Sequence, residues 1–141
     1  MPDLLQSGTL NTPALAAVKR AVDFIKKETV QAIGEHDRYL ANMLIERLKN
    51  INGVTVYGVS GSKRTGTVAF NIKPYDSVYV SEILDKKYRI CTRGGLHCAY
   101  PAHCALGTNK TGAVRASFGY FNTNNDVKKL ADAVYAIASG K

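Results

Sequence analysis

The sequence predicts an α+β fold in which a small, antiparallel-rich sheet is covered by helices. Three observations support it: apolar residues recur at helical spacing in the N-terminal third, short strand-like runs then alternate with helical segments, and a helical pattern returns at the C-terminal end. This order is typical of a sheet with helices on one side. No repeat or linker divides the chain, so residues 1–141 are expected to form a single domain.

Two helices are predicted after an extended entry segment at residues 1–11. Thr12 is expected to cap the first helix, with Pro13 at its first position. A break is expected at Gly34, and the second helix should end near Gly53, because glycine is a common helix stop. The apolar faces of the two helices are Leu15, Val18, Val22 and Ile25, then Leu40, Met43, Leu44 and Leu48.

Strands and helices alternate in the remaining sequence. Strands are predicted at residues 54–57, 67–72, 89–92 and 113–118. One helix should begin at Asp76, a short one should lie near residues 102–107, and a last one should begin at a capping box formed by Thr123 and Asp126. We expect the two N-terminal helices and the last helix to pack on the sheet.

Composition limits the classes of function. Hydrophobic residues make up 45% of the chain, enough for one packed core, and no apolar run is long enough to cross a membrane. The net charge is +8, but Lys and Arg are scattered in ones and twos, so no nucleic-acid partner is expected. The first residues lack the basic start and apolar stretch of a signal peptide, so a cytoplasmic protein is expected.

The three cysteines, Cys91, Cys98 and Cys104, are expected to be reduced thiols, because an odd number without a secretory signal argues against a disulfide framework. Cys98 follows a glycine pair, with Arg93 and His97 near it in sequence. Positive charge beside a thiol favours the thiolate, which is the nucleophilic form. Taken alone, however, the pattern favours a buried small apolar residue. Cys91 is expected to be buried in a strand and Cys98 to be the most accessible thiol.

A metal site and an anion site are the other candidates. His97-Cys98 and His103-Cys104 repeat a pair, but adjacent side chains rarely converge on one ion, so no metal site is predicted. Arg115 stands in the middle of an apolar strand. Its guanidinium could bind a carboxylate or phosphate, or it could simply face solvent, and spacing alone leaves both open.

Three motifs in order resemble one family. They are residues 93–99 (Arg-Gly-Gly-Leu-His-Cys-Ala), 112–118 (Gly-Ala-Val-Arg-Ala-Ser-Phe) and 120–123 (Tyr-Phe-Asn-Thr). They are similar to the C-terminal signature of cysteine desulfurases and selenocysteine lyases, in the class V aminotransferase group. The opening residues 7–12 resemble the start of the small domain of these type I pyridoxal-phosphate enzymes. The short loop that carries Cys98 resembles the subgroup with a compact loop.

The resemblance implies a role for five residues. Cys98 would take sulfur from L-cysteine as a persulfide and leave L-alanine, for sulfur delivery such as Fe–S cluster assembly. Arg115 would bind the substrate carboxylate, with Arg93 in the same pocket and His97 shaping the loop. Thr9 resembles the threonine that reaches the cofactor phosphate of the opposite subunit, which implies a homodimer. A sulfur-acceptor protein is a further implied partner.

The resemblance also has gaps. Leu96 stands where many relatives carry another histidine, and Cys104 has no family role. The lysine that binds pyridoxal phosphate follows a Ser-x-His step in the family, and no lysine here has that context. The large cofactor-binding domain is therefore expected to be absent, and the chain alone is expected to be inactive. A class V aminotransferase, a selenocysteine lyase and an inert dimerisation or binding fragment are the alternatives.

Overall fold

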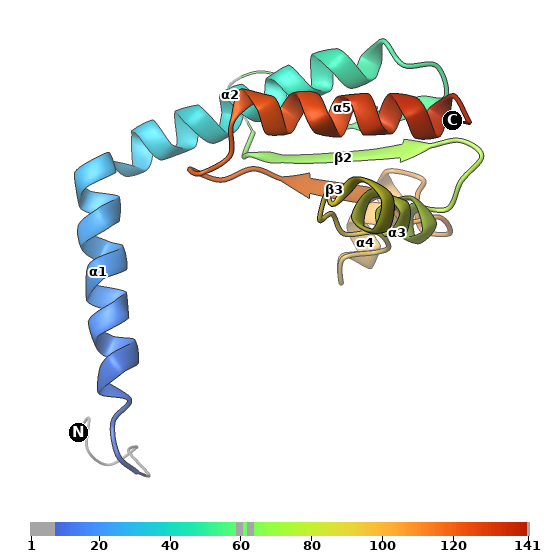
Figure 1. The fold of residues 1–141 in the computed structure, drawn as a ribbon. Helices are drawn as coiled ribbons and strands as arrows, with labels where there is room; N and C mark the ends of the chain where they lie inside the picture. The colour runs from blue at the N-terminus through green and yellow to red at the C-terminus, as the bar shows by residue number, and fades with distance from the viewer. Residues whose placement is uncertain (1–7, 59–60, 62–63, 141) are drawn as a thin grey trace. The chain divides into compact units, whose positions relative to one another are not determined.

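The computed structural model describes residues 8–58, 61 and 64–140, and within them it forms five helices and a three-stranded sheet (Figure 1). The sheet is antiparallel, in the order β1-β2-β3. This confirms the predicted fold class. The elements are α1 (Thr12–Glu28), α2 (Val30–Lys49), β1 (Val54–Tyr57), β2 (Thr67–Ile72), α3 (Ser77–Tyr88), α4 (Tyr100–Ala105), β3 (Val114–Ser117) and α5 (Asn124–Ala138).

The chain divides into two units, residues 1–33 and 34–141, and α1 belongs to the first. Asn11 caps α1, where the Asn11 side chain accepts a hydrogen bond from the Ala14 N–H at 3.1 Å. The predicted cap at Thr12 is one residue late, because asparagine reaches the free N–H groups equally well. The predicted break at Gly34 is also wrong. The chain turns at Thr29 (φ 68°), and Gly34 lies inside α2.

The apolar side chains of α1 are exposed, and none of its residues is buried. The predicted apolar face is present as a stripe, at three- and four-residue spacing. Because α1 and the sheet belong to different units, the packing of this helix on the sheet stays a prediction. The exposed fractions along the stripe are 56% at Leu15, 60% at Val18, 42% at Val22 and 41% at Ile25.

The core belongs to the second unit and lies on one face of the sheet. Alternate residues of β2 are buried there, as the period of a half-buried strand requires. The helix α5 lies along β2 in Figure 1 and contributes to the same core, as do α2 and α3. The buried side chains include Leu40, Leu44, Leu48, Val68, Phe70, Ile72, Val80, Leu84, Val114, Val127, Leu130, Val134 and Ile137.

Two predicted helix starts are confirmed. Asp76 caps α3, because its carboxylate accepts hydrogen bonds from two backbone N–H groups of the first turn, at 2.8 and 3.3 Å. Thr123 and Asp126 form a reciprocal capping box at the start of α5. Both caps depend on residue types only a few positions apart, so sequence alone could identify them.

The predicted strand at residues 89–92 is wrong. Arg89 adopts a left-handed conformation (φ 57°) and ends α3, after which the chain forms no strand pairing with the described residues until Arg93. Arg93 then makes a single bridge to Arg115 of β3. The apolar residues of this segment resemble a strand, but a strand also needs a partner for its backbone, and β3 is within reach only from Arg93 onward.

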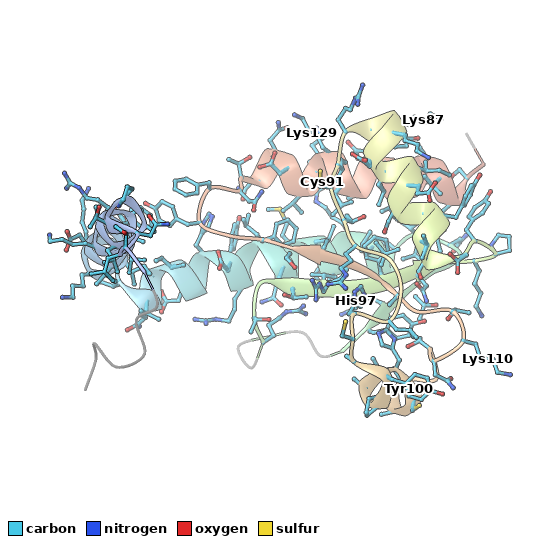
Figure 2. The ribbon with its side chains drawn as sticks, turned by 90° about the horizontal axis from the view of Figure 1, so that it is seen from below. Lys87, Cys91, His97, Tyr100, Lys110 and Lys129 are labelled. Atoms are coloured by element: carbon cyan, nitrogen blue, oxygen red, sulfur yellow. The ribbon has the colours of Figure 1, made fainter. Side chains whose placement is uncertain are left out.

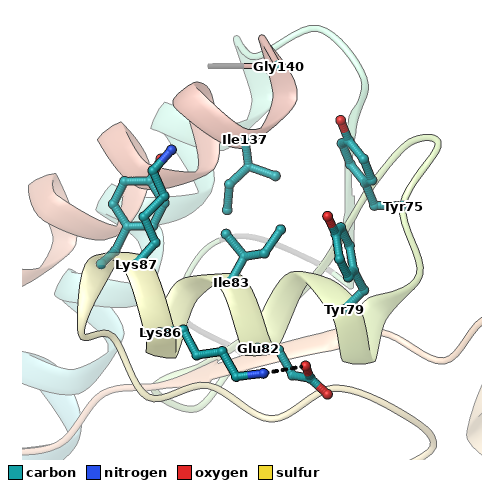
Figure 3. A pocket seen from close by; sticks show the side chains of 9 residues that line it. Tyr75, Tyr79, Glu82, Ile83, Lys86, Lys87, Ile137 and Gly140 are labelled. Carbon is teal, nitrogen blue, oxygen red and sulfur yellow. Dashed lines mark hydrogen bonds and ion pairs between the residues drawn. The ribbon is translucent and has the colours of Figure 1, made fainter.

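A pocket of about 380 Å³ lies between α3 and the end of α5, and Figure 3 shows Ile83 and Ile137 facing each other within it. Tyr75 and Tyr79 form one wall, and Lys87 lies at the other end. None of the predicted site residues lines it.

Among the described helices, none is both long and apolar enough to cross a bilayer.

Candidate functional site

Two arginines are paired at the edge of the sheet. The Arg93 N–H donates to the Arg115 carbonyl at 3.1 Å, and the Arg115 N–H donates back to Arg93 at 2.7 Å. Directly opposed residues of antiparallel segments place their side chains on the same face. Val114 and Ala116 occupy the core face of β3, so both guanidiniums belong to the face without the core.

This arginine pair has no carboxylate partner within the part of the chain that the structure describes. Two adjacent guanidiniums present several N–H donors in planar forks, which suit a carboxylate or a phosphate. A groove of about 310 Å³ lies beside them, because Ala69, which pairs with Arg115, is one of its lining residues. Tyr57 and Leu106 also line it. The structure thus places the Arg115 guanidinium on the face away from the core, and its binding of an anion stays a prediction.

Glycines allow the segment after Arg93 to lie against its neighbours. A Cβ on Gly94 would lie 2.4 Å from the Ser77 carbonyl oxygen, and one on Gly112 would lie 2.7 Å from the Gly95 backbone. Gly112 also has a φ of 63°. Side chains cannot occupy either position without moving backbone, so these contacts require glycine.

Cys98 lies on a tight loop between this segment and α4. His97 and Cys98 both have positive φ values, 55° and 56°, which is uncommon for residues other than glycine. The loop exposes the Cys98 side chain to solvent. The predicted placement of Cys98 on a loop before a short helix is confirmed, although α4 begins at Tyr100 and ends at Ala105, about two residues earlier than expected.

His97 lies between the thiol and the arginine pair in sequence, and its ring is held by the backbone. Its Nε2 lies 2.9 Å from the Ala113 carbonyl oxygen, so Nε2 carries the proton in this contact. The Nδ1 atom is buried and has no hydrogen-bond partner among the described residues. The ring lies 5.6 Å from that of His103, whose Nδ1 is 2.8 Å from the Thr108 hydroxyl.

The pKa of His97 is lower than its ordinary value. Burial is the largest cause, and the hydrogen bond to Ala113 opposes it. The charges of Arg115, His103 and Arg93 lower the pKa further, because each would repel an imidazolium. The neutral ring is therefore the favoured form, with its Nδ1 free to accept a proton or a hydrogen bond. In Figure 2, His97 lies beside the strands, and Tyr100 of α4 lies on the side away from Lys87 of α3.

Acidification is expected to destabilise the fold through His97. Because its pKa is lower in the folded state, the unfolded state binds the proton first once the pH falls below about 6.5. Stability that is present above this pH is lost as the pH falls toward the lowered value. His97→Gln keeps an N–H for Ala113 but does not titrate, so it should lose less stability than wild type between about pH 7.5 and about pH 5.5. Urea unfolding at both pH values measures the difference, and equal losses would contradict this reading.

The other two cysteines are exposed as well. The prediction that Cys91 is buried is wrong, because the strand expected around it does not form and its thiol lies 4.0 Å from the Asp85 carboxylate. Cys104 lies on α4 and is also accessible. Exposure alone therefore does not single out Cys98. Its distinguishing features are the strained loop and the neighbouring arginine pair.

Thr9 belongs to the first unit, unlike the other four predicted site residues. It is exposed and lies in the non-helical segment just before Asn11 and α1. Of the segment predicted to be extended, residues 1–7 lie outside the described residues. The structure brings together Arg93, Arg115, His97 and the Cys98 loop, and Thr9 is described only by itself.

Sequence reasoning missed several residues that hold this site together. Asn71 donates a hydrogen bond to the Gly112 carbonyl at 2.8 Å, and its Oδ1 is buried without a partner among the described residues. The buried Thr108 is hydrogen-bonded to the buried His103, whose ring in turn lies near that of His97. Asn71 could have been suspected, because an asparagine in a strand is unusual. For His103 and Thr108, no local pattern gives a signal.

The sequence matches a known family along most of its length: residues 1–130 match the family described as aminotransferase class-V. A curated relative, the probable cysteine desulfurase of Methanothermobacter thermautotrophicus, is 32% identical over 138 residues. That alignment covers 97% of this chain but 34% of the relative. The cysteine desulfurase of Haloferax volcanii is 30% identical, with 31% of its length covered. The chain thus spans about a third of the length of the curated relatives it matches.

Solved structures show the same pattern. The apo cysteine desulfurase of Thermococcus onnurineus is similar with a TM-score of 0.87 at 28% identity, covering 99% of this chain and 34% of that one. The cysteine desulfurase CsdA of Escherichia coli, solved as an S-sulfonic acid, is similar with a TM-score of 0.78 at 27% identity. The alignment covers 92% of this chain and 31% of that one.

Proposed function

This chain belongs to the class V aminotransferase family, and we propose that it is the C-terminal, small domain of a pyridoxal-phosphate-dependent cysteine desulfurase. In this proposal Cys98 takes sulfur from L-cysteine as a persulfide and L-alanine is released. The single observation that carries it is an exposed thiol on a strained loop, next to His97, which lies near two arginines without an ion pair among the described residues. The cysteine desulfurases among the similar proteins support the same reading.

The residues of this chain suit a pyridoxal-phosphate enzyme, but they cannot bind the cofactor without the rest of the protein. The arginine pair offers donors for an anion, whereas no lysine of the chain follows the Ser-x-His step that the family uses to bind pyridoxal phosphate. The cofactor, when bound, supplies an electron sink that weakens the bonds around the substrate Cα. The residues that bind it covalently are therefore assigned to the part of the protein outside this chain.

The roles of this chain's own residues follow from their chemistry. Arg115 and Arg93 orient the substrate by its carboxylate. The Cys98 thiolate attacks the substrate sulfur, an S–S bond forms as the C–S bond breaks, and the electron pair of that bond passes to the substrate carbon, which takes up a proton. His97 shapes the loop. Thr9 donates to the cofactor phosphate of the opposite subunit, so the proposal includes a homodimer and, beyond it, a sulfur-acceptor protein that serves Fe–S cluster assembly.

The thiol separates this proposal from its closest alternative. An aminotransferase reaction needs no nucleophilic cysteine, so an exposed Cys98 on the loop that follows Arg93 favours sulfur transfer. Selenocysteine would make the same contacts as cysteine. Turnover of the two substrates by one preparation distinguishes a desulfurase from a selenocysteine lyase.

The full-length protein with pyridoxal phosphate should release alanine from L-cysteine and gain one sulfur on Cys98, whereas the 141-residue chain alone should do neither. The physical reason is the missing cofactor lysine. Alanine release and mass-mapped persulfide measure both. Cysteine-dependent sulfide production by the chain alone, above that of Cys98→Ala, would overturn the fragment reading. A full-length protein inactive with cysteine would overturn the proposed function.

A further inference from the structure

The antiparallel pairing that begins at Arg93 and Arg115 is incomplete. At the next hydrogen-bonding pair, Gly95 and Ala113, only one of the two backbone hydrogen bonds forms. Arg93 and Arg115 exchange both of their backbone hydrogen bonds, as a regular antiparallel pair does. At the next pair, the Ala113 N–H donates to the Gly95 carbonyl at 3.1 Å. A regular ladder would return a bond from the Gly95 N–H to the Ala113 carbonyl. Here each of those two groups has a different partner.

Both freed backbone groups bind side chains instead. The Gly95 N–H donates to the Ser77 hydroxyl at 3.2 Å. The Ala113 carbonyl accepts the hydrogen bond from His97 Nε2 at 2.9 Å. The two contacts are linked, because a bond from Gly95 to Ala113 would share with His97 a carbonyl oxygen that has two lone pairs, and His97 would no longer hold that oxygen alone.

The Ser77 hydroxyl has a fixed polarity. Its single proton goes to the Thr111 carbonyl at 2.6 Å, so it can only accept from Gly95. Its own helix does not need it, because Asp76 already caps α3. Ser77 is 1% exposed, and Gly94 packs closely against its backbone. The hydroxyl therefore cannot exchange these partners for solvent. One buried hydroxyl therefore connects the segment before Cys98 to the turn before Arg115.

We propose that Ser77 is a positioning residue for the thiol loop, which we define as residues 95–99. By binding the Gly95 N–H, it leaves the Ala113 carbonyl free for His97 and so holds the imidazole next to Cys98. Without the hydroxyl, the Gly95 N–H turns to the Ala113 carbonyl and shares it with His97, which weakens the hold on the ring. The consequence for catalysis rests on the proposed function, whereas the effect on His97 does not.

The first test compares Ser77→Ala with Ser81→Ala in the full-length protein. Ser81 lies on the same helix, and its hydroxyl is bound to Thr92 at 3.2 Å, away from the thiol loop. Modification of His97 by diethyl pyrocarbonate, mapped by mass spectrometry over a pH series, reports the access and the pKa of the ring. Ser77→Ala should raise the rate at His97 about 5- to 10-fold, the equivalent of one lost hydrogen bond. Ser81→Ala should not change it.

The pH series adds a readout that a general loosening would not give. The loosened ring is less buried, so its pKa should rise toward the ordinary value. The rise should be incomplete, because the Ala113 hydrogen bond that raises its pKa is weakened, and Arg115, Arg93 and His103 still face it. A wild-type rate at His97 in Ser77→Ala, or an equal rise in Ser81→Ala, would overturn the proposal. If Ser77→Ala does not fold, Ser77→Cys takes its place under the same criteria, because a thiol accepts hydrogen bonds only weakly.

The second test measures turnover of L-cysteine. Ser77→Ala should lower kcat about 5- to 10-fold with little change in KM, because the arginine pair keeps its own backbone bonds. Ser77→Thr, which keeps the hydroxyl, should recover most of the rate. An unchanged kcat would overturn the catalytic part. A wild-type protein that does not desulfurate cysteine, but whose His97 responds to Ser77→Ala, would overturn the proposed function and support the positioning role.

Discussion

Replacement of Cys98 by alanine in the full-length protein is expected to abolish transfer of sulfur from L-cysteine to the protein. The thiolate is the group that attacks sulfur, and the backbone and histidine around it cannot replace a soft nucleophile. Persulfide formation should fall by about 10³-fold or more, while the absorbance of bound cofactor stays unchanged. Alkylation of the persulfide followed by mass mapping measures the first effect, and a visible spectrum measures the second.

The other two thiols provide matched controls. Cys91 and Cys104 are exposed like Cys98 but lie outside the strained loop. Cys91→Ala and Cys104→Ala should each retain persulfide formation. Sulfur still loaded onto the Cys98→Ala protein would show that the assignment of Cys98 is wrong, and Cys104 would be the first residue to examine.

Replacement of Arg115 by alanine should weaken capture of the substrate instead of stopping the chemistry. A charge-assisted hydrogen bond to a carboxylate contributes about 1.5–3 kcal/mol, so KM for L-cysteine should rise about 10- to 150-fold. Raising the cysteine concentration should restore turnover. Steady-state kinetics over a wide concentration range measures the effect, and a loss of kcat at unchanged KM would contradict the carboxylate role.

Two further variants sharpen this result. Arg115→Lys keeps the charge but not the planar fork, so it should recover only part of the affinity. Arg47→Ala removes an exposed arginine at the end of α2 and controls for the loss of one positive charge. The Arg115→Ala and Cys98→Ala phenotypes should be separable, because one protein turns over at high cysteine and the other binds cysteine and stalls.

The predictable features of this fold are those set by neighbours in sequence. The caps at Asp76 and Thr123 were predictable because the bonding groups are two or three residues apart. The loop position of Cys98 followed from the glycine pair before it. The helical stripe that begins at Leu15 was also correct as a pattern, but a pattern does not say what covers it.

The features that escaped prediction depend on distant partners. Residues 89–92 have strand-like composition, yet pairing begins only at Arg93, because its partner Arg115 lies far along the chain. Ser77 looked like an ordinary first-turn residue, and its contacts with Gly95 and Thr111 exist only in the folded state. The resemblance to a family named the candidate site residues, but it gave no account of what positions them.

The anchoring of Gly95 limits how far the thiol can travel. Hydrogen bonds to Ala113 and Ser77 hold Gly95, and α4 begins at Tyr100. Cys98 is therefore connected to the fixed Gly95 by a tether of only three residues. Even fully stretched, such a tether spans about 10 Å. In the proposed function, a persulfide on Cys98 would therefore not reach a distant sulfur acceptor. The proposed sulfur-acceptor protein would have to bring its accepting atom within that radius.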